Sequence, residues 1–297
     1  MMSTRIYDMK EDAKVKTRNF KEELLYARDH HYAVGAFNIF NSLSARAVIR
    51  AASAMDLPVI LQTSVTTVKK FGPNELGTML RQLAWNAPVN VIIHLDHCTN
   101  IDIAKACIDS GWDSIMFDGS RLPLNENIAG CREVVAYAHR RGIMVEGELG
   151  KIGGVEEDIV VDAADATGAN LDEAVYFAKE SGIDAFAPAI GTAHGVYKGT
   201  PHIDYQLVEE LSKAIDTPLV VHGGTGLSDE TFHRLISLGA AKINVSTAIK
   251  HAYIDSCKEY MAANPDKLDP IDFDQFMNCS IKDTAMRHMG VFTANKQ

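Results

Sequence analysis

Cysteines are few in this sequence, and they form no recognisable pattern. The five cysteines are scattered over 297 residues, and no Cys-x-x-Cys pair occurs. A disulfide framework in a secreted domain needs an even set of cysteines, and a cysteine-ligated zinc module needs closely paired ones. The sequence therefore predicts neither kind of protein.

Long hydrophobic runs and an excess of positive charge are also absent. No apolar run approaches the roughly 20 residues that span a bilayer, and the charged segment Met1 to Asp12 has no apolar core of a signal peptide. The formal net charge is −10 and the sequence pI is about 5.5, whereas nucleic-acid binding selects basic surfaces. We therefore expect a cytoplasmic protein that interacts with neither membranes nor nucleic acids.

Short apolar runs alternate with segments of helical spacing along the chain. After an initial helix over residues 17–30, strands are predicted at 32–37, 58–61, 89–95, 114–117, 143–149, 185–190, 219–221 and 241–245, and each is followed by a helical segment. Their continuous apolar character is typical of parallel strands that are buried on both faces. Eight strand-then-helix units predict a (β/α)8 TIM barrel.

The barrel accounts for most of the chain. We expect one domain over 1–297, with the barrel at about 17–263 and a C-terminal extension over 264–297. A doubly wound open sheet is the alternative, but no Gly-x-Gly-x-x-Gly fingerprint follows the first strand. Two loops, 150–170 and 192–204, exceed the usual two to six residues, and long loops on this face of a barrel commonly cover or bind a ligand.

Potential metal ligands stand at the ends of several predicted strands. His97, His194 and His222 follow the third, sixth and seventh strands, and Glu148 ends the fifth. Because the carboxyl ends of parallel strands meet at one mouth of a barrel, these side chains should converge. A lone histidine is more often structural than a ligand, but three histidines with a carboxylate nearby favour a catalytic zinc or a similar divalent ion.

Two further features surround these residues. Asp96 precedes His97, and it either orients a ligand imidazole as a hydrogen-bond acceptor or acts as a general acid and base; the sequence leaves both interpretations open. The glycine-rich turn Gly223 to Gly226 follows the seventh strand and the segment Asn244 to Thr247 follows the eighth. Loops at these two places in barrels frequently bind phosphate through backbone N–H groups.

Several ordered motifs resemble one family. They are Ala36-Phe-Asn-Ile, Leu61-Gln-Thr-Ser, His94-Leu-Asp-His, Glu146-Gly-Glu-Leu-Gly, Ile190-Gly-Thr-Ala-His-Gly, His222-Gly-Gly-Thr-Gly and Asn244-Val-Ser-Thr. In this order the chain resembles the class II, metal-dependent ketose-bisphosphate aldolases, especially the branch of tagatose-bisphosphate and fructose-bisphosphate aldolases.

The resemblance implies a role for each matching residue. His97, His194 and His222 would hold Zn2+ or another divalent ion, with Glu148 as an auxiliary ligand, and Asp96 would exchange the proton of the C4 hydroxyl. Glu156 would exchange the C3 proton from the long loop after the fifth strand. The substrate, helped by Na+ or K+, would be bound by Asn38, Ser64, Gly195, Gly223, Gly224, Thr225, Asn244, Val245, Ser246 and Thr247.

The implied function is reversible aldol cleavage of a ketose phosphate to dihydroxyacetone phosphate and an aldehyde. Fructose 1,6-bisphosphate or tagatose 1,6-bisphosphate is the expected substrate, in glycolysis or related carbohydrate metabolism, and the expected assembly is a homo-dimer or homo-tetramer. Alternatives are an aldolase for another ketose phosphate, a non-catalytic sugar-phosphate-binding subunit, a metal-dependent hydrolase and a Schiff-base aldolase that uses Lys242. The chain departs from the family pattern at Cys98 and Lys250, which leaves the aldehyde half of the substrate undefined.

Overall fold

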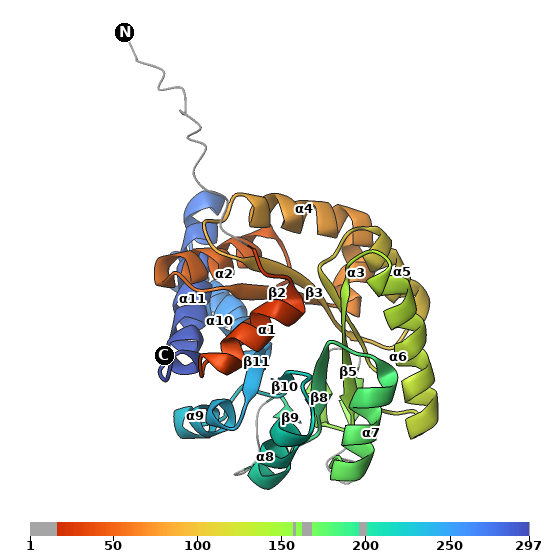
Figure 1. Cartoon of the computed structure of the whole chain (residues 1–297). Helices are drawn as coiled ribbons and strands as arrows, with labels where there is room; N and C mark the ends of the chain where they lie inside the picture. Colours follow the sequence, from red (N-terminus) through yellow and green to blue (C-terminus); the bar gives the residue numbers. More distant parts are fainter. Residues whose placement is uncertain (1–16, 157–158, 162–167, 196–200, 297) are drawn as a thin grey trace.

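The structure, a computed structural model, describes residues 17–156, 159–161, 168–195 and 201–296. Its centre is a closed barrel of eight parallel strands in the order β1-β11-β10-β8-β5-β4-β3-β2 (Figure 1), which confirms the predicted fold. The strands are β1 (Val34–Asn38), β2 (Val59–Ser64), β3 (Val91–Cys98), β4 (Ser114–Phe117), β5 (Met144–Leu149), β8 (Ala185–Pro188), β10 (Leu219–Val221) and β11 (Ala240–Val245).

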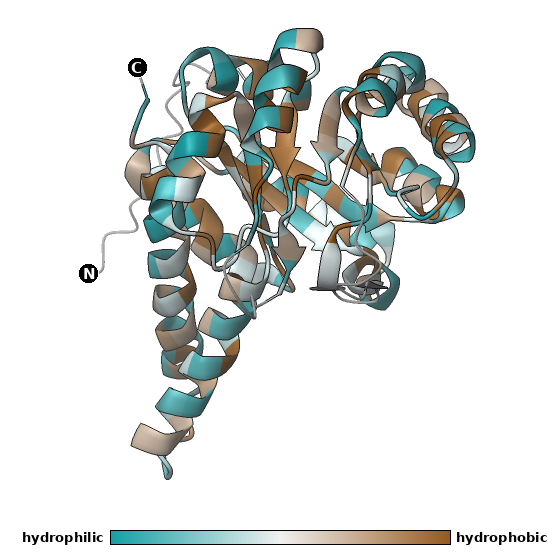
Figure 2. Cartoon of the chain, turned by 90° about the horizontal axis from the view of Figure 1, so that it is seen from below, coloured by the Kyte–Doolittle hydropathy of each residue, from teal (hydrophilic) through white to brown (hydrophobic). Residues whose placement is uncertain are grey.

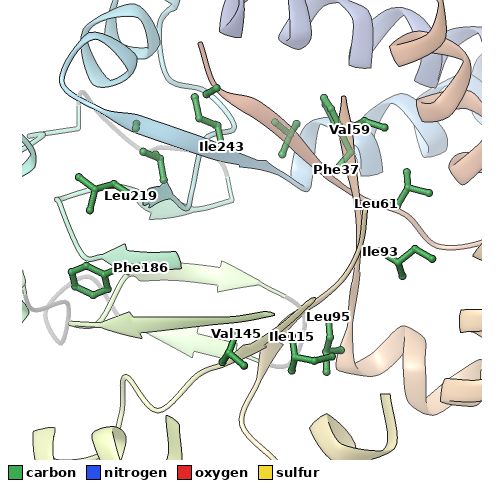
Figure 3. Close-up of a cluster of buried hydrophobic side chains, with 14 of the residues drawn as sticks. Phe37, Val59, Leu61, Ile93, Leu95, Ile115, Val145, Phe186, Leu219 and Ile243 are labelled. Carbon is green, nitrogen blue, oxygen red and sulfur yellow. The ribbon is translucent and has the colours of Figure 1, made fainter. Parts of the chain in front are cut away.

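Helices cover the outside of the barrel. They are α2 (Ser42–Met55), α4 (Pro73–Trp85), α5 (Ile101–Asp109), α6 (Leu124–His139), α7 (Leu171–Ser181), α8 (Tyr205–Ala214), α9 (Asp229–Ser237) and α10 (Thr247–Ala263). Between barrel and helices, apolar side chains from the strands point away from the barrel centre and pack beneath the helices (Figure 3). A second apolar cluster fills the barrel interior.

The helix α1 (Phe20–Asp29) closes the barrel at the end where the strands begin. Phe20, Leu24 and Ala27 are fully buried and belong to the interior cluster. The helix starts at Asn19, whose side chain accepts from the backbone N–H of Glu22 at 2.9 Å, while Glu22 accepts from the backbone N–H of Asn19 at 3.0 Å. This capping box fixes the first turn and therefore the direction of α1 across the end of the barrel.

Side-chain caps fix the start of two helices that follow strands. The cap of α2 is Asn41, whose side chain accepts from the backbone N–H of Ser44 at 2.9 Å. A short helix that was not predicted, α3 (Val65–Phe71), begins directly after β2 with Ser64 as its cap. Its run of threonine and valine reads as strand by composition, so its helical form depends on the position of Ser64 at the strand end.

The two long loops contain a small sheet instead of being irregular throughout. It is made of β6 (Gly153–Glu156), β7 (Ile159–Val161) and β9 (Ala193–His194), in the order β7-β6-β9. At Gly154 an added Cβ atom would lie 2.1 Å from the backbone oxygen of His194. Only glycine permits this approach, which joins the segment after β5 to the segment that carries His194.

The C-terminal extension is helical. The helix α11 (Pro270–Phe292) is capped by Asp269, packs against α2 and α10, and ends where the Phe292 carbonyl accepts from the N–H of Ala33 at 3.1 Å. Figure 2 shows a pair of helices, α10 and α11, that extends beyond the body of the barrel. None of the described helices combines the length and the hydrophobicity that a membrane span requires.

Candidate active site

Three histidines meet at the mouth of the barrel. Nitrogen atoms of His97, His194 and His222 lie within 4.8 Å of one another, and all three residues are buried. They come from the end of β3, from β9 and from the residue after β10. The structure thus brings together the three residues that the sequence singled out as metal ligands.

The end of β3 departs from regular strand geometry to achieve this. In a regular strand Asp96 and His97 would point to opposite faces. The pairing register between β3 and β4 shifts between Leu95 and Cys98, and His97 has a positive φ of 47°. This irregularity lets two adjacent side chains face the same mouth, and it places a strained residue in the site.

Two of the three histidines have a carboxylate behind them. His97 donates from Nδ1 to Asp118 Oδ2 at 3.0 Å, and His222 donates from Nε2 to Glu146 Oε1 at 2.8 Å. The other ring nitrogens, Nε2 of His97 and Nδ1 of His222, face each other at 3.0 Å. Histidines that bind metals in proteins commonly have this carboxylate partner, which fixes the ring and its tautomer.

The donor set fits a divalent cation. With both carboxylates accepting hydrogens, two neutral rings turn their lone pairs toward each other. Glu148 Oε2 lies 3.3 Å from His222 Nδ1, and among the described residues this buried oxygen has no hydrogen-bond partner. A cation such as zinc binds imidazole nitrogen and carboxylate oxygen and would satisfy these lone pairs together.

A second group of potential ligands shares His97. His97, Asp118 and Glu148 offer atoms within 4.8 Å of one another. Burial and the charge of Asp118 raise the pKa of Glu148 well above its ordinary value. Burial would also raise the pKa of Asp118, but hydrogen bonds from His97 and Ser120 outweigh it and hold the pKa below its ordinary value. Sequence reasoning missed Asp118, although it directly follows the fourth strand.

Amide groups surround the carboxylate of Asp96. Its Oδ2 accepts from Asn38 Nδ2 at 3.0 Å and from Gln62 Nε2 at 3.2 Å, and its Oδ1 accepts from Asn244 Nδ2 at 3.2 Å. Gln62 also donates to Asn38 Oδ1 at 2.7 Å. Three donors from β1, β2 and β11 fix the orientation of this carboxylate. Gln62 was not among the predicted site residues.

The glycine-rich loop after β10 packs closely against neighbouring backbone. An added Cβ atom at Gly223, which has a φ of 69°, would lie 2.5 Å from the Ala193 oxygen, and one at Gly224 would lie 2.7 Å from the Asn244 oxygen. Thr225 Oγ1 accepts from the N–H of Ala248 at 3.3 Å in the first turn of α10. The loop after β10 is therefore tied to His194 on one side and to the start of α10 on the other.

The segment Asn244 to Thr247, where β11 ends and α10 begins, presents buried polar atoms that lack partners among the described residues. Ser246 is the N-terminal cap residue of α10, yet its side chain makes no cap hydrogen bond. Within the described part of the chain, Ser246 Oγ and Asn244 Oδ1 are buried and have no hydrogen-bond partner. Val245 is buried in the same segment and Thr247 begins the helix. Such atoms suit a polar ligand, because leaving them unpaired is costly.

The remaining predicted residues are placed as follows. Ser64 is buried at the end of β2, and Gly195, with a φ of 85°, follows His194. The backbone of Glu156 pairs with Ile159 in the β6–β7 hairpin, and the Glu156 side chain lies outside the described part of the structure. Lys242 is fully buried, and its Nζ lies 2.8 Å from Glu146 Oε2. That ion pair makes Lys242 a poor candidate for a Schiff-base nucleophile.

Comparison with known proteins agrees with this geometry. The sequence model of the family "Fructose-bisphosphate aldolase class-II" matches residues 18–297. The structure is similar to the YdjI aldolase from Escherichia coli K12, with 30% identity, a TM-score of 0.83, and coverage of 94% of this chain and 98% of that one.

Two further structures are similar to this chain. A putative fructose-1,6-biphosphate aldolase from Coccidioides immitis has 28% identity and a TM-score of 0.84 over 95% of this chain and 98% of that one. Fructose-bisphosphate aldolase from Campylobacter jejuni, at 22% identity and a TM-score of 0.79 over 92% and 94% of the two chains, shows the shared fold.

Proposed function

Because the chain belongs to the class II fructose-bisphosphate aldolase family, and is therefore a lyase by family, we propose that it catalyses the zinc-dependent, reversible aldol cleavage of a ketose phosphate. The products would be dihydroxyacetone phosphate and an aldehyde. The observation that carries this proposal is the pairing of a three-histidine cluster with an amide-held carboxylate on adjacent residues, His97 and Asp96.

The metal would be held by His97, His194 and His222, with Glu148 as an auxiliary ligand. A bound divalent ion would supply Lewis-acid polarisation of the substrate carbonyl at C2. The protein itself would keep the three rings in place, two of them through Asp118 and Glu146. Na+ or K+ would bind near the phosphate of the substrate and help to hold it.

Asp96 would serve as the acid and base for the C4 hydroxyl. In cleavage it would take the hydroxyl proton on a carboxylate oxygen, and in condensation it would return that proton. The amides of Asn38, Gln62 and Asn244 support this role, because they hold the carboxylate in one orientation. Of the two interpretations that the sequence left open, we favour acid and base catalysis, because Asp118 is a carboxylate that already accepts from the His97 ring and orients it.

The phosphate of the dihydroxyacetone half would lie between the loops after β10 and β11. Gly195, Gly223, Gly224, Thr225 and the segment Asn244 to Thr247 would form this site, and Asn38 and Ser64 would line the rest of the substrate pocket. The unpartnered Ser246 hydroxyl and the start of the 17-residue helix α10 support an anion here. Glu156 would exchange the C3 proton.

Fructose 1,6-bisphosphate and tagatose 1,6-bisphosphate are the first substrates to test. A coupled assay would measure cleavage of both sugars and of other ketose phosphates, with chelator and with zinc added back. Chelator-sensitive release of dihydroxyacetone phosphate would support the proposal, and the preferred sugar would define the specificity. Activity that is indifferent to the chelator would contradict it. Zinc binding without turnover of any sugar would favour a binding subunit.

A further inference from the structure

A network of charged side chains lies inside the barrel beneath the candidate metal ligands. Glu146 on β5 and Lys242 on β11 are fully buried, and their charged atoms, Oε2 and Nζ, lie 2.8 Å apart. The other carboxylate oxygen of Glu146 accepts from His222 Nε2 at 2.8 Å. His94 Nε2 lies 3.7 Å from Glu146 Oε2, and its ring stacks on Phe20 of α1.

This network occupies the layer directly below the site. Side chains at i and i+2 on a strand point to the same face, so His94, Glu146 and Lys242 lie below Asp96, Glu148 and Asn244 on β3, β5 and β11. The interior of such barrels is ordinarily filled by branched apolar side chains. Burying two opposite charges there usually gains no stability over an apolar pair of similar volume. The ion pair therefore calls for a role other than stabilising the barrel.

The ion pair lies directly next to one of the candidate metal ligands, His222. Lys242 occupies one oxygen of Glu146, which leaves the other oxygen directed at His222 Nε2. A carboxylate there requires the hydrogen on Nε2, so the lone pair is on Nδ1. That atom faces His97 Nε2 at 3.0 Å, within the histidine cluster. A rotation or the other tautomer of the His222 ring would remove its lone pair from the cluster.

We propose that Glu146 and Lys242 are positioning residues that fix the ring orientation and tautomer of His222 as a metal ligand. Glu146 acts on His222 directly, and Lys242 acts through Glu146 by holding its carboxylate in place. This inference rests on the proposed metal site. It assigns to Lys242 a supporting role in a metal-dependent reaction, in place of covalent chemistry with the substrate.

The test replaces the ion pair as a unit, so that no single charge stays buried. In the double variant Glu146→Leu with Lys242→Met, His222 Nε2 loses its acceptor while the interior stays filled. We expect zinc to bind about 10- to 100-fold more weakly, as measured by competition with a chromophoric chelator. The visible absorption spectrum of the Co2+-substituted protein should also change, because it reports the ligand geometry directly.

A second double variant keeps the test decisive if the first does not fold. Glu146→Gln with Lys242→Met retains a neutral acceptor for His222 without the carboxylate charge, and should bind zinc more weakly than the wild type. The matched control is Asp184→Asn. Asp184 is also buried between a lysine and a histidine, Lys21 at 3.3 Å and His139 at 2.7 Å, but it precedes β8 at the opposite end of the barrel.

The outcomes separate the inference from the proposed function. Folded double variants with wild-type zinc affinity and an unchanged Co2+ spectrum would overturn the positioning role and leave the metal site intact. A wild-type protein that binds no stoichiometric zinc would overturn both. Equal weakening in Asp184→Asn would mean that general destabilisation explains the loss, and would also overturn the inference.

Discussion

At the scale of single residues, the site depends on hydrogen-bond partners that hold each functional group in one state. Asp96 receives three amide donors, and His97 and His222 each donate to a buried carboxylate. These partners come from five different strands or strand ends. The chemistry attributed to a few residues therefore depends on most of the rim of the barrel.

The first prediction concerns Asp96. Asp96→Asn removes the proton acceptor but keeps the size of the side chain, so turnover of the preferred ketose phosphate should fall about 10²- to 10⁴-fold. Zinc content should stay at the wild-type level, because the three histidines are unchanged. Steady-state kinetics and metal analysis on the same preparation provide the measurement. Unchanged turnover would remove Asp96 from its assigned role.

The glycine at the start of the loop after β10 gives a second prediction. In Gly223→Ala, the new Cβ atom would lie 2.5 Å from the Ala193 oxygen at a φ of 69°, so the loop must shift. We expect KM for the phosphorylated substrate to rise about tenfold or more. Gly142→Ala is the control, because Gly142 has a similar φ of 71° but open space around it.

Both alanine variants place an L-residue in the left-handed backbone region, and the control measures the effect of that change alone. An L-residue in the left-handed region costs roughly 1–2 kcal/mol, so both proteins should lose at least that much stability in denaturant titrations, and Gly223→Ala should lose more because its Cβ atom meets neighbouring backbone. Only Gly223→Ala should change KM. A raised KM in both variants would attribute the effect to stability and not to the proposed phosphate loop.

At the scale of elements, the strands were the most predictable part of the molecule. The predicted strands 114–117 and 219–221 match β4 and β10 to the residue. The run Ser114 to Phe117 is bounded by Asp113 and Asp118, and four residues are too few for a helix, so its length and its polar flanks favour a buried strand.

The features that the sequence did not reveal depend on contacts between distant segments. The irregularity at the end of β3 exists because β4 lies beside it, and β6 pairs with β9 only because glycine at 154 permits the approach to His194. The polar residues at i and i+2 in Glu146-Gly-Glu148 did carry a usable signal. Two carboxylates that point into the barrel from one buried strand imply two layers of polar side chains in the barrel interior.

The helix α11 offers a prediction on pH. His288 is buried on α11, and burial lowers its pKa; Arg287 on the same helix lowers it further, while Asp229 of α9 opposes the shift. A histidine whose folded pKa is lowered contributes stability that is present above its unfolded pKa of about 6.5 and is lost as the pH falls below that value.

We therefore compare wild type with His288→Gln. Between pH 6.5 and 5, the free energy of unfolding of the wild type should fall more steeply than that of the variant, by at most about 1.4 kcal/mol per pH unit. Urea titrations at several pH values measure this slope. Identical slopes for the two proteins would show that His288 protonates in the folded state as readily as in the unfolded one.

At the scale of the whole molecule, the barrel is closed at one end by α1 and open at the other. The Phe20 ring stacks on His94 with centroids 5.3 Å apart, so α1 contacts the network of charged side chains beneath the site. Phe20→Ala should cost about 3–5 kcal/mol of stability, as is usual for a buried aromatic residue. Thermal or urea unfolding would measure this loss. Leu25→Ala on the same helix, where the side chain is only half-buried, should cost clearly less.

The last prediction concerns the paired helices α10 and α11. Of the nine large hydrophobic side chains that are exposed in the described part of the chain, five lie on these helices or their link: Ile254, Met261, Leu268, Ile271 and Phe276. Leu268 is 95% and Ile271 73% exposed. Such a concentration on a projecting pair of helices (Figure 2) is typical of a surface that another protein chain covers.

We expect the wild-type protein to self-associate through this surface. Light scattering coupled to size-exclusion chromatography should give the mass of a dimer or tetramer for the wild type and a smaller mass for Leu268→Glu with Ile271→Glu. Tyr176→Glu is the control, because it places one such negative charge on an exposed aromatic position of α7 and should leave the mass unchanged. The side chains of Leu268 and Ile271 contribute almost nothing to the core, so the variant should keep its circular dichroism spectrum and its bound zinc. A monomeric wild type, or a variant of unchanged mass, would contradict the expectation and leave the exposed apolar side chains of this helix pair to another partner.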